Sequence, residues 1–278
     1  MNMYDKLINL IEKTKKPLTK YDFIDAYKRL GIKKNSFLEV HSSISNFGYI
    51  VNKEYDICDS LIETVTDGVV IMMGHTGEFS DPSEWVNPPV PKEWHLFINE
   101  HRKPFDKDLF IPERIGKVAA LFPRYKNVSR TNHPTQSMSV LNNTNDPSWI
   151  EHDLDDTKMI NPLSKLAKSK GKILFIGTDF NSCTSIHLTE HLSPYSCQKD
   201  YNYQRLNDES LIEDVIVRLK YIEDDEVDNF KAIKELYISK YEGTEFYKKE
   251  VLGLSTITLI DAKELFEVAK EFHTSYRK

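Results

Sequence analysis

Two short apolar stretches in the first quarter of the chain, Phe37-Leu38-Glu39-Val40-His41 and Val69-Val70-Ile71-Met72-Met73, decide the predicted fold. Both are typical of strands, and the second is apolar throughout, as a strand buried on both faces is. Between them, residues 56–66 carry apolar side chains at helical spacing, and Gly68 follows. The order strand, helix, strand at this spacing predicts an α/β protein with parallel strands.

The rest of the chain extends this pattern without an internal repeat or a low-complexity linker. Lys172-Ile173-Leu174-Phe175-Ile176-Gly177 is a further apolar strand, and residues 213–222 alternate apolar and polar side chains, as a half-exposed strand does. Further strands are expected at 136–141 and 256–260, and helices are expected at 3–13, 19–30, 92–102, 113–122, 182–192, 227–240 and 261–273. The mixed order predicts a three-layer α/β/α fold with a mixed sheet, as one domain over residues 1–278.

An inserted loop rich in tryptophan and proline interrupts this pattern at about residues 74–112. Loops of this length in compact domains are usually functional or disordered, and the aromatic residues favour an ordered segment. The loop is interpreted either as a wall or lid over a site or as a packed surface loop.

The composition is that of an ordinary globular protein. The 278 residues are 40% hydrophobic and 29% charged. The net charge of −6 argues against DNA or RNA as a partner, because phosphate binding requires a basic face. No apolar run is long enough to predict a membrane span, and the first residues lack the order of a signal peptide, which favours a cytoplasmic location. Cys58, Cys183 and Cys197 lack CxxC spacing and are expected to be reduced thiols; the oligomeric state is not predicted.

Two candidate sites follow from local sequence. His41-Ser42-Ser43-Ile44-Ser45 directly follows the first predicted strand. Small hydroxyl residues at a helix start leave backbone N–H groups that attract phosphate, so the segment is either an anion site or a plain helix cap. Further along, Pro134 holds the preceding His133 in an extended backbone, which suits either a functional imidazole or a structural turn histidine.

A third candidate segment, residues 179–191, follows an apolar strand. Crevices at the carboxyl ends of strands are the usual ligand sites of α/β folds. Thr184, His187, Glu190 and His191 recur at three- and four-residue steps, so they are expected to share one helix face. A carboxylate beside an imidazole fixes its tautomer and raises its basicity, which suits a general base.

The same segment also matches a metal signature. His187-x-x-Glu190-His191 has the HxxEH spacing of a zinc hydrolase. Such an enzyme needs a further glutamate ligand, for which Glu264 and Glu267 are available. Cys183 as a nucleophile is a weaker alternative, because it lies on the adjacent turn without an evident partner.

Six ordered segments together resemble the aminoglycoside 3-N-acetyltransferase family, also called the antibiotic N-acetyltransferases. Residues 40–48 resemble the family's His-Ser-Ser-Leu-Ser…Gly segment, and residues 177–190 resemble its Gly-x-x-x-Asp-x-x-Thr-x-x-His-x-x-Glu segment. The other matching segments, in chain order, are residues 68–72, 114–116, 130–137 and 161–166. The resemblance covers nearly the whole chain and implies a fold other than the usual GNAT acetyltransferase fold.

Two segments depart from the family pattern. Met138-Ser139-Val140-Leu141-Asn142 stands where the family has Phe-Ala-Ala-x-Gly, and Gly74-His75-Thr76 stands where many members have Pro-Thr-Phe. Both segments lie where the resemblance implies the acceptor, so a different amine acceptor is an alternative to an aminoglycoside.

The resemblance implies transfer of acetyl from acetyl-CoA, as co-substrate, to a primary amine such as the 3-amino group of an aminoglycoside, with no metal. It also implies a CoA site built by the opening segment and two later elements: His41, Ser42, Ser43, Ile44, Arg114, Ile115, Gly116 and Ser137. Phosphates are expected at the helix start and at Arg114, whose guanidinium fork suits phosphate oxygens.

For the chemistry, His187 is expected to accept a proton from the amine, oriented by Glu190 or Asp179. The amine then attacks the thioester directly, and Thr184 or a backbone N–H stabilises the oxyanion. His133 is expected to contact the thioester or to share the role of base. Acidic side chains at the mouth are expected to hold a cationic acceptor: Glu78, Asp81 and Glu84. Two alternatives of other classes are the zinc hydrolase and a catalytically idle binding protein.

Overall fold

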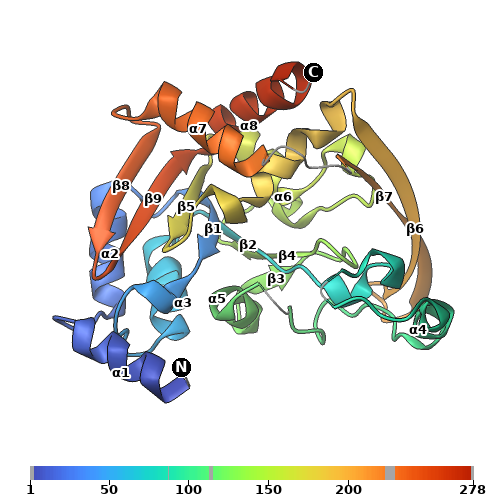
Figure 1. Ribbon diagram of the computed structural model, residues 1–278, viewed down its shortest axis with the longest axis horizontal. Helices are drawn as coiled ribbons and strands as arrows, with labels where there is room; N and C mark the ends of the chain where they lie inside the picture. The colour runs from blue at the N-terminus through green and yellow to red at the C-terminus, as the bar shows by residue number, and fades with distance from the viewer. Residues whose placement is uncertain (1–2, 87, 113–114, 223–228, 277–278) are drawn as a thin grey trace.

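The computed structural model describes residues 3–86, 88–112, 115–222 and 229–276 of the chain. Its centre is a seven-stranded mixed sheet in the order β3-β4-β2-β1-β5-β9-β8 (Figure 1). The strands are β1 (Phe37–Ser42), β2 (Val69–Met73), β3 (Val128–Arg130), β4 (Met138–Asn142), β5 (Lys172–Ile176), β8 (Tyr247–Leu252) and β9 (Ser255–Asp261).

The three central strands of this sheet run parallel. β1 pairs with β2 on one side and with β5 on the other, and all the outer pairings are antiparallel. The carboxyl ends of β1, β2 and β5 therefore meet at one edge of the sheet. Ligand sites of α/β sheets form at such an edge.

Helices cover both faces of the sheet, as Figure 1 shows. One face carries α2 (Lys20–Leu30), α3 (Glu54–Thr64) and α5 (Lys117–Leu121), and the other carries α6 (Pro162–Lys168), α7 (Asn229–Tyr241) and α8 (Ala262–Glu271). Alternate residues of β5 serve the two cores: Leu174 and Ile176 face the first group, and Ile173 and Phe175 face the second. The predicted three-layer α/β/α fold with a mixed sheet is confirmed.

A two-stranded hairpin, β6 (Ser196–Leu206) and β7 (Ile212–Ile222), stands apart from the main sheet at the right of Figure 1. The inserted loop, which contains the short helix α4 (His95–His101), is ordered against it. The Phe105 N–H donates to the Gln204 carbonyl at 2.8 Å, and the Leu206 N–H donates to the Phe105 carbonyl at 2.8 Å. The loop and the hairpin both contribute side chains to one cavity, which supports the wall interpretation.

Two expected helices near the strand ends are wrong in type. The expected helix at 182–192 consists of two 3₁₀ segments, Phe180–Ser182 and Thr184–Leu192. Serine and aspartate side chains there bond to nearby backbone groups, as the Ser182 hydroxyl does to the Asp179 carbonyl at 2.9 Å, and such bonds compete with an α-helix. The expected helix start at Ser43 opens only the three-residue 3₁₀ turn Ile44–Asn46.

The N-terminal helix α1 (Met3–Lys13) forms where its periodicity predicts. Leu7, Ile8 and Ile11 on this helix remain exposed, so these three side chains do not join either core. In the described ranges, no helix combines the length and the apolar character needed to cross a membrane.

Candidate active site

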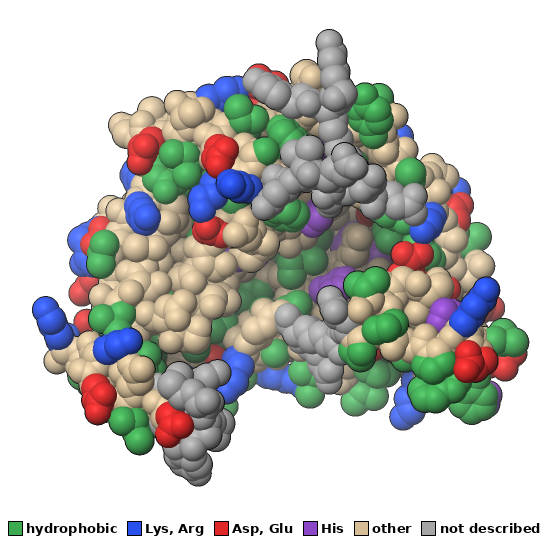
Figure 2. Space-filling view, in the orientation of Figure 1, with side chains coloured by type: hydrophobic (Ala, Val, Ile, Leu, Met, Phe, Trp, Pro, Cys, Tyr) green, Lys and Arg blue, Asp and Glu red, His purple; other side chains and the backbone are tan. Residues whose placement is uncertain are grey.

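A cavity of about 760 Å³ lies at the carboxyl ends of the central strands. Figure 2 shows it as a hollow in which histidine side chains gather. Its walls come from the end of β1, the inserted loop, the 3₁₀ segment Thr184–Leu192 and the hairpin β6–β7. The charged or polar side chains that line it include His41, Ser42, His75, Asp81, Glu84, His152, Asp156, Thr184, His187, Glu190 and His191.

His187 and Glu190 form the central pair of this cavity. A 3₁₀ helix has three residues per turn, so Thr184, His187 and Glu190 lie directly above one another. His187 Nδ1 lies 2.6 Å from Glu190 Oε1, and Glu190 is buried. Donation of the Nδ1 proton to this carboxylate makes Nε2 the acceptor nitrogen of the neutral ring. The pair therefore has the geometry of an oriented general base.

Asp179, the alternative partner predicted for His187, is engaged elsewhere. Its carboxylate accepts from the Asn181 N–H at 3.1 Å and forms an ion pair with Lys234 Nζ at 2.5 Å. These contacts join the end of β5 to helix α7. Glu190 is thus the carboxylate that orients His187, whereas Asp179 is paired with Lys234.

His133 is fully buried and does not line the cavity. Its Nδ1 accepts backbone N–H groups of Thr135 at 3.3 Å and Gln136 at 3.0 Å, and its ring packs on His152 with centroids 4.5 Å apart. Burial, together with the nearby His152 and Arg205, holds the pKa of His133 well below its usual range. This neutral ring supports His152 from behind, so the predicted contact of His133 with the thioester has no geometry to support it.

His152 is a cavity residue that the sequence did not reveal, because it lies in a polar loop without periodicity. Thr131 Oγ1 accepts from the Met138 N–H at 2.9 Å and lies 3.0 Å from His152 Nδ1. Burial lowers the pKa of His152 to about 4, so the ring is neutral at pH 7.

Acid should destabilise the folded protein, because His152 is buried as a neutral ring. The folded-state pKa of His152 lies below the unfolded value of 6.5, so the unfolded chain binds the proton first as the pH falls. The stability is complete above pH 6.5 and is lost progressively towards pH 4, by about 3 kcal/mol for His152 alone. Urea unfolding at pH 7 and pH 5 should show about 2 kcal/mol of this loss. His152→Asn should lose less stability on acidification than the wild type; an equal loss in both would contradict the assignment.

Asp156 is the second cavity residue missed from the sequence. Burial and the neighbouring Asp155 carboxylate raise the pKa of Asp156 to about 7, and the charges of His187 and Glu190 also act on it. Asp155 itself is paired with Arg218 at 3.3 Å. Asp156 therefore places a further acidic group beside the His187–Glu190 pair.

Some of the residues predicted to bind CoA line the cavity, and others lie behind its walls. His41, Ser42 and Ile115 line the cavity. Ser43 and Ile44 follow in the backbone turn behind it, and the Ser43 N–H donates to the Ile176 carbonyl at 2.8 Å. The element that starts after Ser43 is the three-residue 3₁₀ turn Ile44–Asn46, so the helix N-terminus at which a phosphate was expected does not form here.

The remaining predicted CoA residues lie around the inserted loop. Gly116 precedes α5 with φ +89°, and Arg114 lies outside the described residues. Ser137 is fully buried: its hydroxyl donates to the Gly74 carbonyl at 2.7 Å and accepts from Arg130 Nε at 2.9 Å. Ser137 thus anchors the start of the loop instead of lining the cavity.

Two of the three predicted acceptor-binding acids line the cavity. Asp81 accepts from the Ser83 N–H at 2.8 Å, and Glu84 forms an ion pair with Lys199 at 3.1 Å. Glu78 lines a separate, smaller hollow beside α4, so its predicted role has no support from its position.

The zinc signature does not form a metal cluster. His187 Nδ1 is held by Glu190, and a 3₁₀ helix moves His191 off their line. Glu264 accepts from the Tyr241 hydroxyl at 2.5 Å, and Glu267 lies 3.9 Å from Lys270 Nζ. Among the described residues, the compact set of metal-ligating type is Glu39, His41 and Cys183, whose ligand atoms lie within 4.8 Å of one another.

The mixed sheet and the histidine–carboxylate pair at its strand ends define an α/β enzyme. The family model described as "Aminoglycoside 3-N-acetyltransferase" matches residues 40–274. The chain therefore belongs to this family of acyltransferases.

Individual relatives agree with this assignment. The chain is 34% identical over 189 residues to the SPbeta prophage-derived aminoglycoside N(3')-acetyltransferase-like protein YokD of Bacillus subtilis (strain 168). The aligned residues cover 67% of this chain and 70% of that protein. The crystal structure of YokD superposes with a TM-score of 0.81 at 28% identity, covering 97% and 98% of the two chains.

Two ligand complexes share the fold. AAC-IIIb in a binary complex with CoASH superposes with a TM-score of 0.77 at 20% identity, covering 92% of this chain and 96% of that one. AAC-VIa bound to sisomicin superposes with a TM-score of 0.76 at 20% identity, covering 92% and 97%.

Proposed function

We propose that this protein transfers the acetyl group of acetyl-CoA to a primary amine of an aminoglycoside, at the 3-amino position. The observation that carries the proposal is the His187–Glu190 pair, 2.6 Å apart, in the cavity of a chain that belongs to this family. The CoASH complex of AAC-IIIb and the sisomicin complex of AAC-VIa support this choice of donor and acceptor. A donor made inside cells also agrees with the cytoplasmic location expected from the sequence.

The first step is removal of a proton from the amine. An alkyl ammonium has no lone pair, so it must lose one proton before it can attack. His187 Nε2 accepts this proton, and Glu190 stabilises the imidazolium that forms. General-base help of this kind typically contributes about 10²–10⁴-fold to the rate.

The second step is direct attack on the thioester carbonyl, without a covalent enzyme intermediate. The Thr184 hydroxyl or a backbone N–H of the same 3₁₀ segment stabilises the oxyanion. Cys183 does not serve as a nucleophile, because burial and the charge of Glu39 raise the pKa of its thiol well above the usual range.

Acidic side chains make the cavity suitable for a polycation. Asp81, Glu84 and Asp156 line it. Asp156 becomes fully ionised when a bound ammonium offsets the burial that raises its pKa. An aminoglycoside carries several ammonium groups and suits this arrangement.

A thiol-release assay tests the proposal. Purified protein and acetyl-CoA are mixed with a panel of amines, and free CoA is read with a thiol reagent. Rapid release is expected with aminoglycosides that bear a 3-amino group, and none is expected with analogues that lack it. Release with other amines only would contradict the proposed acceptor, and no release with any amine would contradict acetyl transfer itself.

A further inference from the structure

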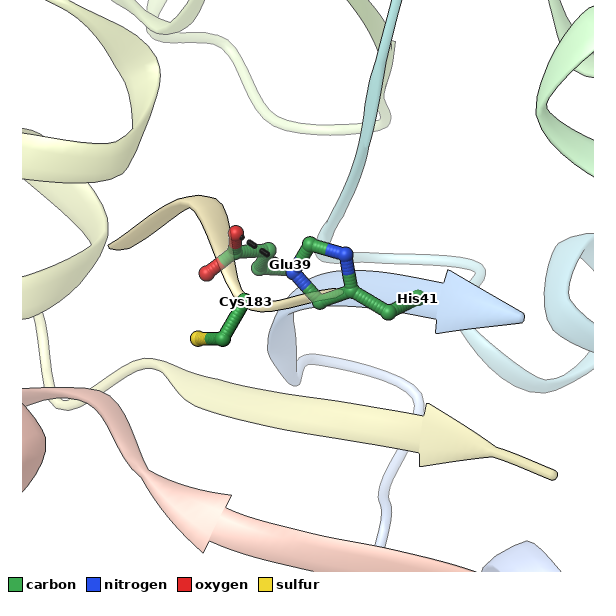
Figure 3. A group of neighbouring side chains, drawn as sticks. All are labelled: Glu39, His41 and Cys183. Carbon is green, nitrogen blue, oxygen red and sulfur yellow. Dashed lines mark hydrogen bonds and ion pairs between the residues drawn. The ribbon is translucent and has the colours of Figure 1, made fainter. Parts of the chain in front are cut away.

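Glu39 is a buried carboxylate that the proposed amine chemistry does not use. It lies in β1, two residues before His41, so both side chains project from the same face of the strand. Glu39 Oε1 lies 2.7 Å from His41 Nε2, and Glu39 Oε2 accepts the Ser185 hydroxyl at 2.5 Å. Figure 3 draws the contact between Glu39 and His41 as a dashed line. Glu39 is only 1% exposed, and both of its carboxylate oxygens have hydrogen-bond partners inside the protein.

The buried carboxylate of Glu39 needs a positive charge beside it. Within the described residues, the hydrogen-bond partners of the Glu39 side chain are His41 and Ser185, and a hydroxyl brings no charge. The nearby Cys183 is a neutral thiol, because burial and Glu39 raise its pKa. A neutral His41 would leave a net negative charge buried away from water, which is costly. A proton shared between Glu39 and His41 offsets this buried charge, and the 2.7 Å contact places the pair to hold that proton beside the cavity.

His41 also reaches the reaction cavity. It is 7% exposed and lines the cavity with Ser42 and Thr184. Since Nε2 is bonded to Glu39, Nδ1 is the ring nitrogen available to a ligand. Ser185 directly follows Thr184, so its bond to Glu39 joins the end of β1 to the segment that carries His187. The histidines of two histidine–carboxylate pairs thus line the cavity, His41 from β1 and His187 from the 3₁₀ segment.

We propose that His41 is the acid that protonates the departing thiolate of CoA, with Glu39 and Ser185 as positioning residues. This inference rests on the proposed acetyl transfer. The ammonium gives one proton to His187 before attack, the N–C bond then forms, and the second proton of that nitrogen passes to solvent. As the oxyanion collapses the C–S bond breaks, and its electron pair goes to sulfur, which takes the proton of His41. Solvent then returns one proton to His41 and removes one from His187, so one proton is released per acetyl group transferred.

A resident metal at Glu39, His41 and Cys183 is the competing assignment for this cluster. A metal needs a deprotonated thiolate and free carboxylate oxygens. The Cys183 thiol is held neutral, and both oxygens of Glu39 already accept hydrogen bonds. The observed bonds therefore favour the proton-holding pair.

The test varies the leaving group. Acetyl-CoA is compared with the acetyl thioester of an aromatic thiol, whose more acidic sulfur leaves without help from an acid. Glu39→Gln keeps the size of the side chain and removes the buried charge, so it leaves no unpaired carboxylate and should fold. Its turnover with acetyl-CoA should fall by about 10²-fold, but by less than about threefold with the aromatic thioester. The double variant Glu39→Gln/His41→Gln should fall no further, since the two residues act as one unit.

Cys183→Ser is the matched control, because it alters the same cluster without removing the acid. It should keep both the turnover and the ratio between the two donors. Equal losses with both donors in Glu39→Gln would show a merely structural role and overturn the proposal. Stoichiometric zinc that Cys183→Ser loses together with activity would also overturn it. If the wild type fails with both donors, the proposed acetyl transfer itself is contradicted, whereas donor-independent losses contradict only the role of His41.

Discussion

Replacing His187 with alanine is expected to cut turnover at least about a hundredfold. The variant lacks the ring nitrogen that accepts the amine proton, so most of the amine stays protonated and cannot attack. Binding of acetyl-CoA should be nearly unchanged, because His187 lies on a different wall from His41 and Ser42. Turnover with a saturating acceptor measures the first effect, and the rise in melting temperature with acetyl-CoA measures the second.

The matched control for this variant is His101→Ala. His101 is exposed, stacks on Phe97 and lines the smaller hollow beside α4, away from the cavity. It should retain wild-type turnover. If His187→Ala also retained it, His187 would have no part in the mechanism and the base would have to be sought elsewhere in the cavity.

Gly177→Ala is expected to have the largest effect on stability. Gly177 directly follows β5 and has φ +68°, a left-handed conformation that disfavours a side chain. An added Cβ would lie 2.3 Å from the Ser43 carbonyl oxygen and 2.5 Å from Cε2 of Phe47. Both neighbours are held, since the Ser43 N–H is bonded to Ile176 and Phe47 is buried in the core. Strain and contact together should cost at least about 3 kcal/mol of the free energy of unfolding.

Gly243→Ala separates the two causes of this loss. Gly243 also has a positive φ, +81°, but nothing lies within 4 Å of the position of its Cβ. Urea unfolding should show a loss of about 1 kcal/mol for Gly243→Ala, from backbone strain alone. Gly177→Ala should additionally weaken acetyl-CoA binding, because it displaces Ser43 behind the donor site. Equal losses of stability in both variants would contradict a tight contact at Ser43.

The central sheet was predictable because its strands carry strong, simple patterns. β1, β2 and β5 are short apolar runs at regular spacing, and burial on both faces requires such runs. The strands that escaped prediction are polar. β8 is an edge strand with the sequence Tyr-Lys-Lys-Glu-Val-Leu, and the residues of β6 that turn inward include Lys199 and Arg205 as well as tyrosines, so neither strand shows an apolar pattern.

The candidate site was predictable only where its residues follow one another in sequence. The three-residue spacing placed His187 and Glu190 on one face, in a 3₁₀ segment as in an α-helix, but the sequence left Asp179 as an alternative partner, and the structure has the contact with Glu190. Glu39 was hidden inside a strand, where a single carboxylate among apolar residues signals nothing without its partner Ser185, 146 positions away. His152 and Asp156 come from a loop whose position depends entirely on tertiary packing.

The most direct test of the account is the mass of the acceptor after reaction. A 3-amino aminoglycoside is incubated with acetyl-CoA and either the wild type or His187→Ala. Mass spectrometry measures the mass of the product, and NMR locates the acetylated nitrogen. The account predicts the gain of one acetyl group on the 3-amino nitrogen with the wild type, and at least about a hundredfold slower formation of the same product with the variant. An acceptor that stays unmodified in the presence of the wild type, or that is acetylated equally fast by both proteins, would contradict it.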